Sequence, residues 1–209
     1  KIYISNDLKL SKRGLIKRIQ DDSLDTKVNK KLINKVQIQS VKDREEISTD
    51  EWCLEVITTP GHMFDHICLA LKDTNVIFSG DHVMGWSSTM IIPPMGNMSQ
   101  FVLSLKKLLG RQENIYLPGH GSLITGAKKY VKTQLTHKQN REAEILNWIK
   151  LKPSAPDELV KLIYPNLNYQ LVDAANHNTL AHLINLVEKN LVLCERKISI
   201  KSKFFIPAL

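Results

Sequence analysis

The chain has 209 residues, enough for one large domain or for one domain with a small additional unit. Its composition, 43% hydrophobic and 24% charged, is that of a globular protein. No apolar stretch approaches the ~20 residues of a membrane-spanning helix, so we expect no membrane partner. The net charge of +8 comes from scattered lysines that are not interleaved with aromatic residues. Charge alone therefore does not decide between an anionic partner such as nucleic acid and compositional drift.

The cysteine content indicates a reducing environment. The three cysteines are Cys53, Cys68 and Cys194, an odd number without a C-x-x-C spacing. Cys53 and Cys68 fall within predicted strands, where a free thiol packs as a small apolar side chain. We expect no disulfide framework and a cytoplasmic location.

The first fifty residues are polar and only weakly patterned. Residues 1–5 form a plausible strand, and helices are expected around residues 13–20 and 27–35. The mixed stretch 36–47 is compatible with an edge strand and a turn.

The stretch from 52 to 117 is rich in predicted strands. Residues 52–59 alternate bulky and β-branched side chains, and two apolar runs flank the turn residues 72–75 as in a hairpin. Apolar residues at helical spacing predict a helix over 99–109, with Gly110 as its C-cap. A short buried strand is expected at 114–117.

The remaining chain is predominantly helical. A long amphipathic helix is predicted over 127–151. Beyond it, Ser154 is a candidate N-cap for the next helix, and residues 173–192 predict another. A β-like stretch, 191–200, follows. Two helices and a strand pair are the outline of a winged-helix-like unit, whose wing we expect to be short.

One arrangement occurs at three strand ends: an apolar run, a Gly-containing break, and then a polar side chain. The stretches are TTPGHMFDH (58–66), VIFSGDHVMG (76–85) and YLPGHGSLITG (116–126). Loops that follow buried strands commonly carry chemistry. If the three strands lie side by side, the side chains of His62, Asp81 and His120 converge on one edge of the sheet.

These residue types suit a metal site. Two neutral imidazoles and a carboxylate are a common ligand set for Zn²⁺, and the two oxygens of Asp81 allow it to bridge two ions. Asp81 is also the candidate catalytic residue. Taken singly, each has a simpler interpretation, as a turn histidine or as an aspartate that hydrogen-bonds its own loop. We expect His66 to hold the loop or a ligand by hydrogen bonding, and His82 to be structural.

The motifs TPGH (59–62), SGD (79–81) and PGHG (118–121) resemble the later metal-binding motifs of the metallo-β-lactamase fold superfamily. The stretches HKQNREAEIL and ANHNTLAHLINLVEKNLV are similar to the helix and winged-helix extension of its lactamase-like protein two and hydroxyacylglutathione-hydrolase-like branch. The resemblance implies an α/β (α+β) fold. Residues 1–152 would form the C-terminal part of an αββα sandwich, and residues 153–209 a winged-helix-like domain.

The resemblance also implies roles for the candidate residues. His62 would be a terminal ligand of one zinc ion, Asp81 the bridging carboxylate, and His120 a ligand of the second zinc ion. The HxHxDH motif of the family, which supplies the remaining ligands, is absent from the sequence as given, and none of its seven histidines forms an H-x-H pair. We therefore expect an incomplete two-zinc site, low activity of this chain alone, and a likeness to the C-terminal portion of such a protein.

The sequence is compatible with two classes of function. The resemblance implies a metal-dependent hydrolase in which activated water attacks an ester, thioester, lactam or RNA phosphodiester. The winged-helix unit and basic charge favour RNA, whereas the stretch GDHVMGWSSTMIIPP, similar to bacterial members, favours a small ester or thioester. The alternative is a non-catalytic remnant, or a nucleic-acid-binding or interaction protein that retains the fold. A homodimer and a complementing N-terminal fragment are the protein partners considered.

Overall fold

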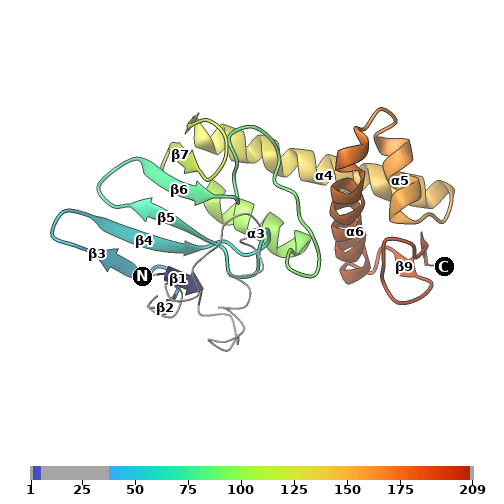
Figure 1. Cartoon of the computed structure of the whole chain (residues 1–209), viewed down its shortest axis with the longest axis horizontal. Coiled ribbons are helices and arrows are strands. Elements are labelled where there is room, and N and C mark those ends of the chain that lie inside the picture. The colour runs from blue at the N-terminus through green and yellow to red at the C-terminus, as the bar shows by residue number, and fades with distance from the viewer. Residues whose placement is uncertain (1, 6–37, 208–209) are drawn as a thin grey trace.

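A computed structural model describes residues 2–5 and 38–207 of the chain. The helices expected around 13–20 and 27–35 lie outside these residues. A mixed sheet with two helices forms one end of the molecule, and a smaller, mainly helical unit forms the other (Figure 1).

The sheet has six strands in the order β3-β4-β5-β6-β7-β8. All neighbours are antiparallel except β6 and β7, which are parallel. Strands β4, β6 and β7 therefore run in the same direction, and their C-terminal ends lie at the same edge of the sheet. The strands and the hairpin expected between 52 and 117 are confirmed. The bounds are β3 Glu46–Ser48, β4 Cys53–Thr58, β5 Ile67–Leu71, β6 Val76–Gly80, β7 Ile115–Pro118 and β8 Ile124–Thr125.

A separate two-stranded sheet involves the start of the chain. Strand β1, Ile2–Ser5, pairs in parallel with β2, Ile38–Val41. The strand expected over residues 1–5 is confirmed. The stretch 36–47 holds β2 and the first part of β3 on either side of a turn, as the sequence predicted.

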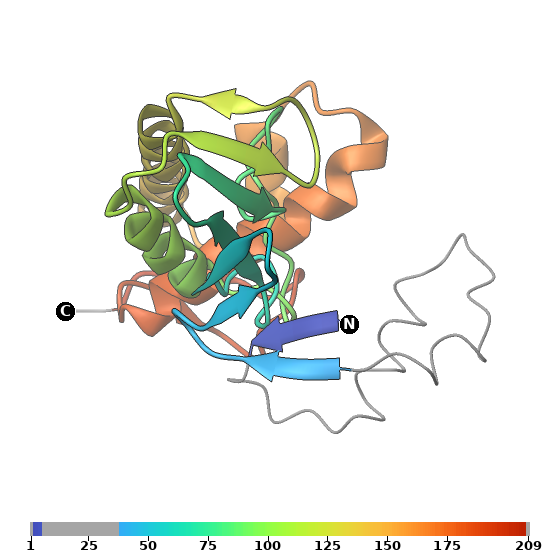
Figure 2. The same cartoon turned by 90° about the vertical axis from the view of Figure 1, so that its left-hand side faces the viewer.

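Two helices lie on one side of the six-stranded sheet (Figure 2). Helix α3, Met98–Leu109, begins where the side chain of Asn97 accepts a hydrogen bond from the backbone N–H of Gln100, and it ends at Gly110 as expected. Helix α4, Ala127–Leu151, has the predicted bounds. Their apolar faces and the inward-facing residues of the strands form the first core, which includes Ile57, Ile77, Phe101, Leu105, Tyr116 and Val131.

The smaller unit contains two helices and a short strand pair. Helix α5 is Pro156–Ile163, a 3-10 helix covers Tyr169–Leu171, and α6 is Val172–Glu188. Strands β9, Leu193–Cys194, and β10, Phe204–Phe205, pair antiparallel. The second strand of the wing, β10, therefore lies beyond residue 200, which the sequence pattern had predicted as the end of the wing.

The expected N-cap of α5 is wrong by one residue. Ala155 occupies the cap position, and its N–H donates to the carboxylate of Glu158 at 2.8 Å. Ser154 instead forms two backbone hydrogen bonds with Phe204, so its backbone is paired with strand β10 of the wing rather than capping helix α5.

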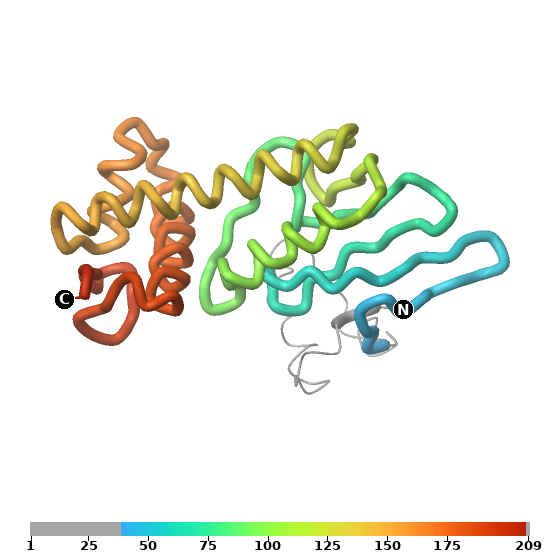
Figure 3. Tube along the Cα trace, turned by 180° about the vertical axis from the view of Figure 1, so that it is seen from behind, coloured from blue at the N-terminus to red at the C-terminus, as the bar shows by residue number. Residues whose placement is uncertain are grey.

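The long helix α4 belongs to both halves of the molecule (Figure 3). Its first turns pack Ala127 and Val131 into the first core, and its last turns pack Ile145 and Ile149 into a second core with Leu159 and other residues of the smaller unit. Within the described residues, no helix combines the length and apolarity needed to cross a bilayer.

Candidate functional site

The three predicted site residues follow three strands that end at the same edge of the sheet. His62 lies in the turn after β4, Asp81 comes directly after β6, and His120 follows β7 by two residues. The parallel β6–β7 pairing places the last two next to each other, because Gly80 is opposite Pro118 in the register.

Asp81 and His120 form the centre of this edge. The Nε2 atom of His120 lies 3.6 Å from Oδ1 of Asp81. The two loops are joined by a backbone hydrogen bond of 2.9 Å from the N–H of Gly119 to the carbonyl of Gly80. Both side chains are accessible, with 62% of the His120 side chain and 36% of the Asp81 side chain exposed. The pair can therefore reach a substrate or an ion from solvent.

His62 lies further along the same edge. Its Nδ1 atom is 3.0 Å from the carbonyl oxygen of Met90, which orients the ring and leaves Nε2 for another partner. The rings of His62 and His66 meet edge to face, with centroids 6.5 Å apart.

His66 connects the loop to the sheet, the role the sequence suggested. Its Nδ1 atom is 2.8 Å from Oγ1 of Thr59, and its carbonyl accepts the N–H of Thr59 at 2.9 Å. Burial and, to a smaller extent, the charge of His62 lower the pKa of His66 to about 4, although the carboxylate of Asp81 acts in the opposite direction. His66 is therefore a neutral hydrogen-bonding residue at neutral pH.

His82 is fully buried beside this edge. Its ring packs against Phe101 with centroids 4.5 Å apart, and neither ring nitrogen has a hydrogen-bond partner among the described residues. Burial, followed by the nearby rings of His66 and His62, lowers its pKa well below the usual value. This is the environment of a structural residue.

A short loop segment, residues 86–90, contacts all three candidate residues. The ring of Trp86 stacks on that of His120, with centroids 6.5 Å apart. The hydroxyl of Thr89 donates to the carbonyl of Asp81 at 2.7 Å, and the carbonyl of Met90 is the partner of His62. The pattern of strands and turns gave no indication of these contacts. The only sequence signal was the similarity of the 80–94 stretch to bacterial proteins.

The same segment forms one wall of a cleft. The cleft has a volume of about 690 Å³ and lies between the sheet half and the smaller unit. Trp86 and Met90 line it on one side, Leu167 and Leu171 on the other, and the middle of α4 lies along it. Its wall is mostly apolar, and it adjoins the edge that carries Asp81 and His120.

Side chains suited to binding a metal ion therefore lie at the same edge of the sheet, but they do not form a complete coordination shell. Asp81 and His120 are neighbours, and His62 is held on the same edge with one ring nitrogen available. In the part of the chain that the structure describes, no group of three or more His, Cys, Asp or Glu side chains is placed to hold a metal ion. These residues fit one portion of a coordination shell.

Comparison with protein families agrees with this fold. Residues 10–120, more than half of the chain, match the model of the metallo-beta-lactamase superfamily, and residues 155–198 match the beta-lactamase associated winged helix domain. The chain belongs to the metallo-β-lactamase superfamily and carries the winged helix domain associated with it.

Similar proteins span longer chains. A beta-lactamase-like protein 2 homolog of Drosophila melanogaster is 27% identical over 72% of this chain, which spans 51% of that protein. An atrochrysone carboxyl ACP thioesterase of Aspergillus fumigatus is 31% identical over 52% of this chain and 33% of its own length. The chain thus spans between a third and half of these relatives.

A solved structure shows the same fold. A metallo-beta-lactamase family protein of Thermus thermophilus superposes with a TM-score of 0.72 at 19% identity, covering 99% of this chain and 72% of that protein. A beta-lactamase domain protein from Burkholderia ambifaria has the same TM-score over 84% of this chain and 55% of its own.

Proposed function

We propose that the chain carries the Asp81–His120 part of a hydrolytic site that cleaves small esters or thioesters. The observation that carries this proposal is the contact of segment 86–90 with all three candidate residues, because the same segment lines the apolar cleft. A substrate bound in the cleft would present its reacting carbonyl to the edge of the sheet.

The side chains at the edge of the sheet have separate roles in the proposed site. His62, Asp81 and His120 would hold divalent metal ions, zinc in the first instance, which would polarise the carbonyl and activate water. Thr89 fixes the backbone of Asp81, and Trp86 covers one face of His120.

The remaining ligands must come from a segment that carries the HxHxDH motif, because the given sequence has no H-x-H pair. We propose that such a segment acts within the same polypeptide or as a complementing fragment. Without it, the Asp81–His120 pair lacks the donors that fix the ions, and hydrolysis is expected to be slow.

The substrate class follows from the cleft. A mostly apolar wall of this volume suits an acyl chain better than a phosphodiester backbone, which requires several cationic side chains along its path. The one lysine in the cleft lining, Lys138, already donates to the carbonyl of Thr89. The thioesterase names among the relatives support the same class. RNA cleavage is the second candidate, favoured by the winged helix domain and the net charge of +8.

A comparative hydrolysis assay tests the proposal. The chain is supplemented with Zn²⁺ and a fragment carrying HxHxDH, and is offered butyryl and hexanoyl thioesters, a lactam and a single-stranded RNA. Thioester hydrolysis that is lost in Asp81→Asn and His120→Gln is expected. Cleavage of RNA without thioester hydrolysis would contradict the proposal and support RNA cleavage, the second candidate function. Rapid, chelator-sensitive turnover by the 209-residue chain alone would show that its ligands lie elsewhere.

A further inference from the structure

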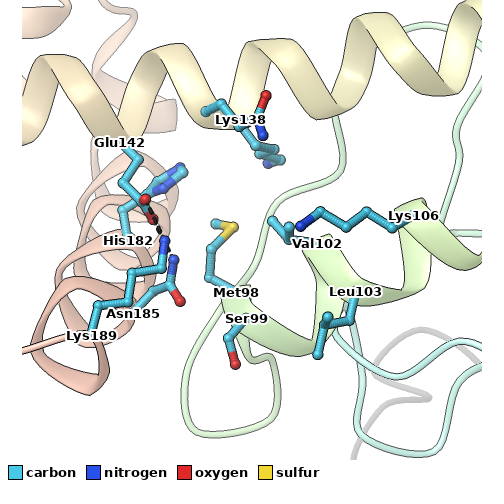
Figure 4. A pocket seen from close by; sticks show the side chains of 11 residues that line it. Met98, Ser99, Val102, Leu103, Lys106, Lys138, Glu142, His182, Asn185 and Lys189 are labelled. Atoms are coloured by element: carbon cyan, nitrogen blue, oxygen red, sulfur yellow. Dashed lines mark hydrogen bonds and ion pairs between the residues drawn. The ribbon is translucent and has the colours of Figure 1, made fainter.

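A second cavity lies where three helices meet, and Lys138 lines both this cavity and the cleft. Helices α3, α4 and α6 enclose a volume of about 290 Å³ (Figure 4). It is smaller than the cleft and separate from the Asp81–His120 edge. Met98 and Val102 of α3 form one wall, and His182 and Asn185 of α6 face them across the cavity.

The wall from α6 carries buried polar atoms without partners. His182 is only 1% exposed, and neither of its ring nitrogens has a hydrogen-bond partner among the described residues. The side-chain oxygen of Asn185, a residue 2% exposed, is also unpaired within the described chain. Buried polar groups in native proteins are nearly always hydrogen-bonded. The ring N–H of His182 therefore indicates an acceptor in the cavity, whereas the oxygen of Asn185 is an acceptor and needs a donor such as water.

The charges around the cavity favour an anion. Lys138 of α4 is buried, with its ammonium donating to the carbonyl of Thr89 at 2.6 Å, and Lys106 of α3 extends toward the cavity (Figure 4). Neither lysine forms an ion pair within the described chain. The single carboxylate among the lining residues, Glu142, is already paired with Lys189 and bonded to Asn185. Two cationic groups are thus left without a counter-charge in this part of the structure.

Burial and the nearby Arg141 lower the pKa of Lys138 to about 7. A bound anion would offset this desolvation and favour the charged amine. His182 is likewise held neutral, because burial and then the charges of Lys138 and Arg141 lower its pKa well below the usual value. His182 therefore contributes a neutral ring N–H to the polar end of the cavity.

We propose that this cavity binds a small aliphatic carboxylate. The carboxylate accepts hydrogen bonds from Lys138, Lys106 and His182, and the aliphatic part packs on Met98 and Val102. The volume, at the lower limit of ligand pockets, limits the ligand to a short chain. The carboxylate of Glu142 on the wall disfavours a dianion such as phosphate, and the lysines disfavour a cation.

The site is independent of the proposed hydrolysis and can be tested without an activity assay. The probe is sodium butyrate, added to the full chain with ¹³C-methyl methionine. The methyl signal of Met98 reports on the cavity and that of Met90 on the cleft. Butyrate is expected to shift the Met98 signal saturably and at lower concentrations than it shifts Met90, because the cleft is itself proposed to accept acyl chains. Inorganic phosphate and the neutral isostere 1-butanol are expected to leave both signals unchanged.

Variants separate the site from general effects of charge. Lys106→Met removes an exposed cation on α3 and should weaken butyrate binding about tenfold or more, as expected for a charge-assisted hydrogen bond. Lys150→Met removes the same charge from an exposed position in the last turn of α4, outside the cavity lining, and should bind as the parent does. His182→Gln, which retains one donor, should weaken binding as well.

Several results would overturn the proposal. The absence of a saturable Met98 shift with butyrate is one. A Met98 signal that titrates with the same midpoint as Met90, or a Lys106→Met variant that binds as tightly as Lys150→Met, are others. Because Lys106 is exposed, its variant is expected to fold, and the test stands even if the His182 variant does not fold.

Discussion

Gly119 and Asp81 approach each other so closely that no side chain fits between them. A Cβ atom on Gly119 would lie 2.5 Å from Oδ1 of Asp81, well inside van der Waals contact. The Gly of the second P-G-H turn is therefore what allows the carboxylate to lie beside His120. A comparable approach occurs at Gly80, where φ is +52° and a Cβ would lie 2.7 Å from Nε2 of His66.

Gly119→Ala is expected to displace the Asp81 carboxylate. Thioester hydrolysis by the complemented chain should fall at least about tenfold, because a displaced ligand lies outside productive geometry. The free energy of unfolding should fall by about 1–3 kcal/mol from overpacking. Steady-state kinetics and urea unfolding measure the two effects. Gly110→Ala is the control, since its Cβ would meet only a carbonyl oxygen at 3.3 Å. Unchanged kinetics in Gly119→Ala would show that Asp81 does not act from this position.

Zinc should bind the chain weakly and at less than one ion per chain. Two neighbouring donors and a more distant His62 cannot fill two coordination spheres. Elemental analysis after gel filtration gives the stoichiometry. Asp81→Asn and His120→Gln should remove the residual zinc, whereas His177→Gln, a change on α6, should not. Two tightly held ions per chain would contradict this prediction.

Stability should fall as the pH drops below about 6.5. His66, His82 and His182 are held neutral in the folded protein because burial lowers each pKa below the usual 6.5. Below pH 6.5 the unfolded chain therefore binds more protons than the folded chain, and unfolding is favoured. Above pH 6.5 their contribution is fully present.

The expected slope is about 1.4 kcal/mol per pH unit for each of these histidines, between about pH 6 and 5. Urea unfolding at several pH values measures it. His182→Phe, if the variant folds, should reduce this slope by the contribution of one histidine, about 1.4 kcal/mol per pH unit. A free energy of unfolding that is constant between about pH 7.5 and 5 would mean that the three rings titrate normally.

Removing a side chain from the second core should destabilise the whole chain. Leu183 is fully buried, so Leu183→Ala is expected to lower the free energy of unfolding by about 2–5 kcal/mol. Leu162→Ala, at a position 48% exposed, is the control and should have little effect. Because α4 contributes to both cores, calorimetry should show one transition that shifts as a unit. Two separate transitions would indicate that the halves unfold independently.

The sequence allowed the strand ends and the helices α3 and α4 to be predicted, since alternation and helical spacing arise from backbone geometry. The proximity of Asp81 and His120 could also be predicted, because both residues follow strands whose C-terminal ends lie at the same edge of the sheet. The contacts of Trp86, Thr89 and Met90 could not be predicted, because an aperiodic loop has no repeating pattern that fixes its path.

The division of the chain into two units was harder to predict. A boundary after residue 152 follows from Pro153, yet the apolar face of α4 already packs on the smaller unit at Ile145 and Ile149. An amphipathic pattern shows that a helix buries one face, but it does not show which partner each turn contacts.

Helix α4 contains neither glycine nor proline along its 25 residues, about 37 Å of continuous helix. Thr133, Gln134 and His137 from its middle turns line the cleft, while both of its ends are anchored in packed cores. A helix held at both ends and lacking a break has no hinge through which the cleft could widen. The wall that α4 contributes to the cleft therefore keeps its position relative to both cores, so an acyl group bound in the cleft would lie along a fixed surface.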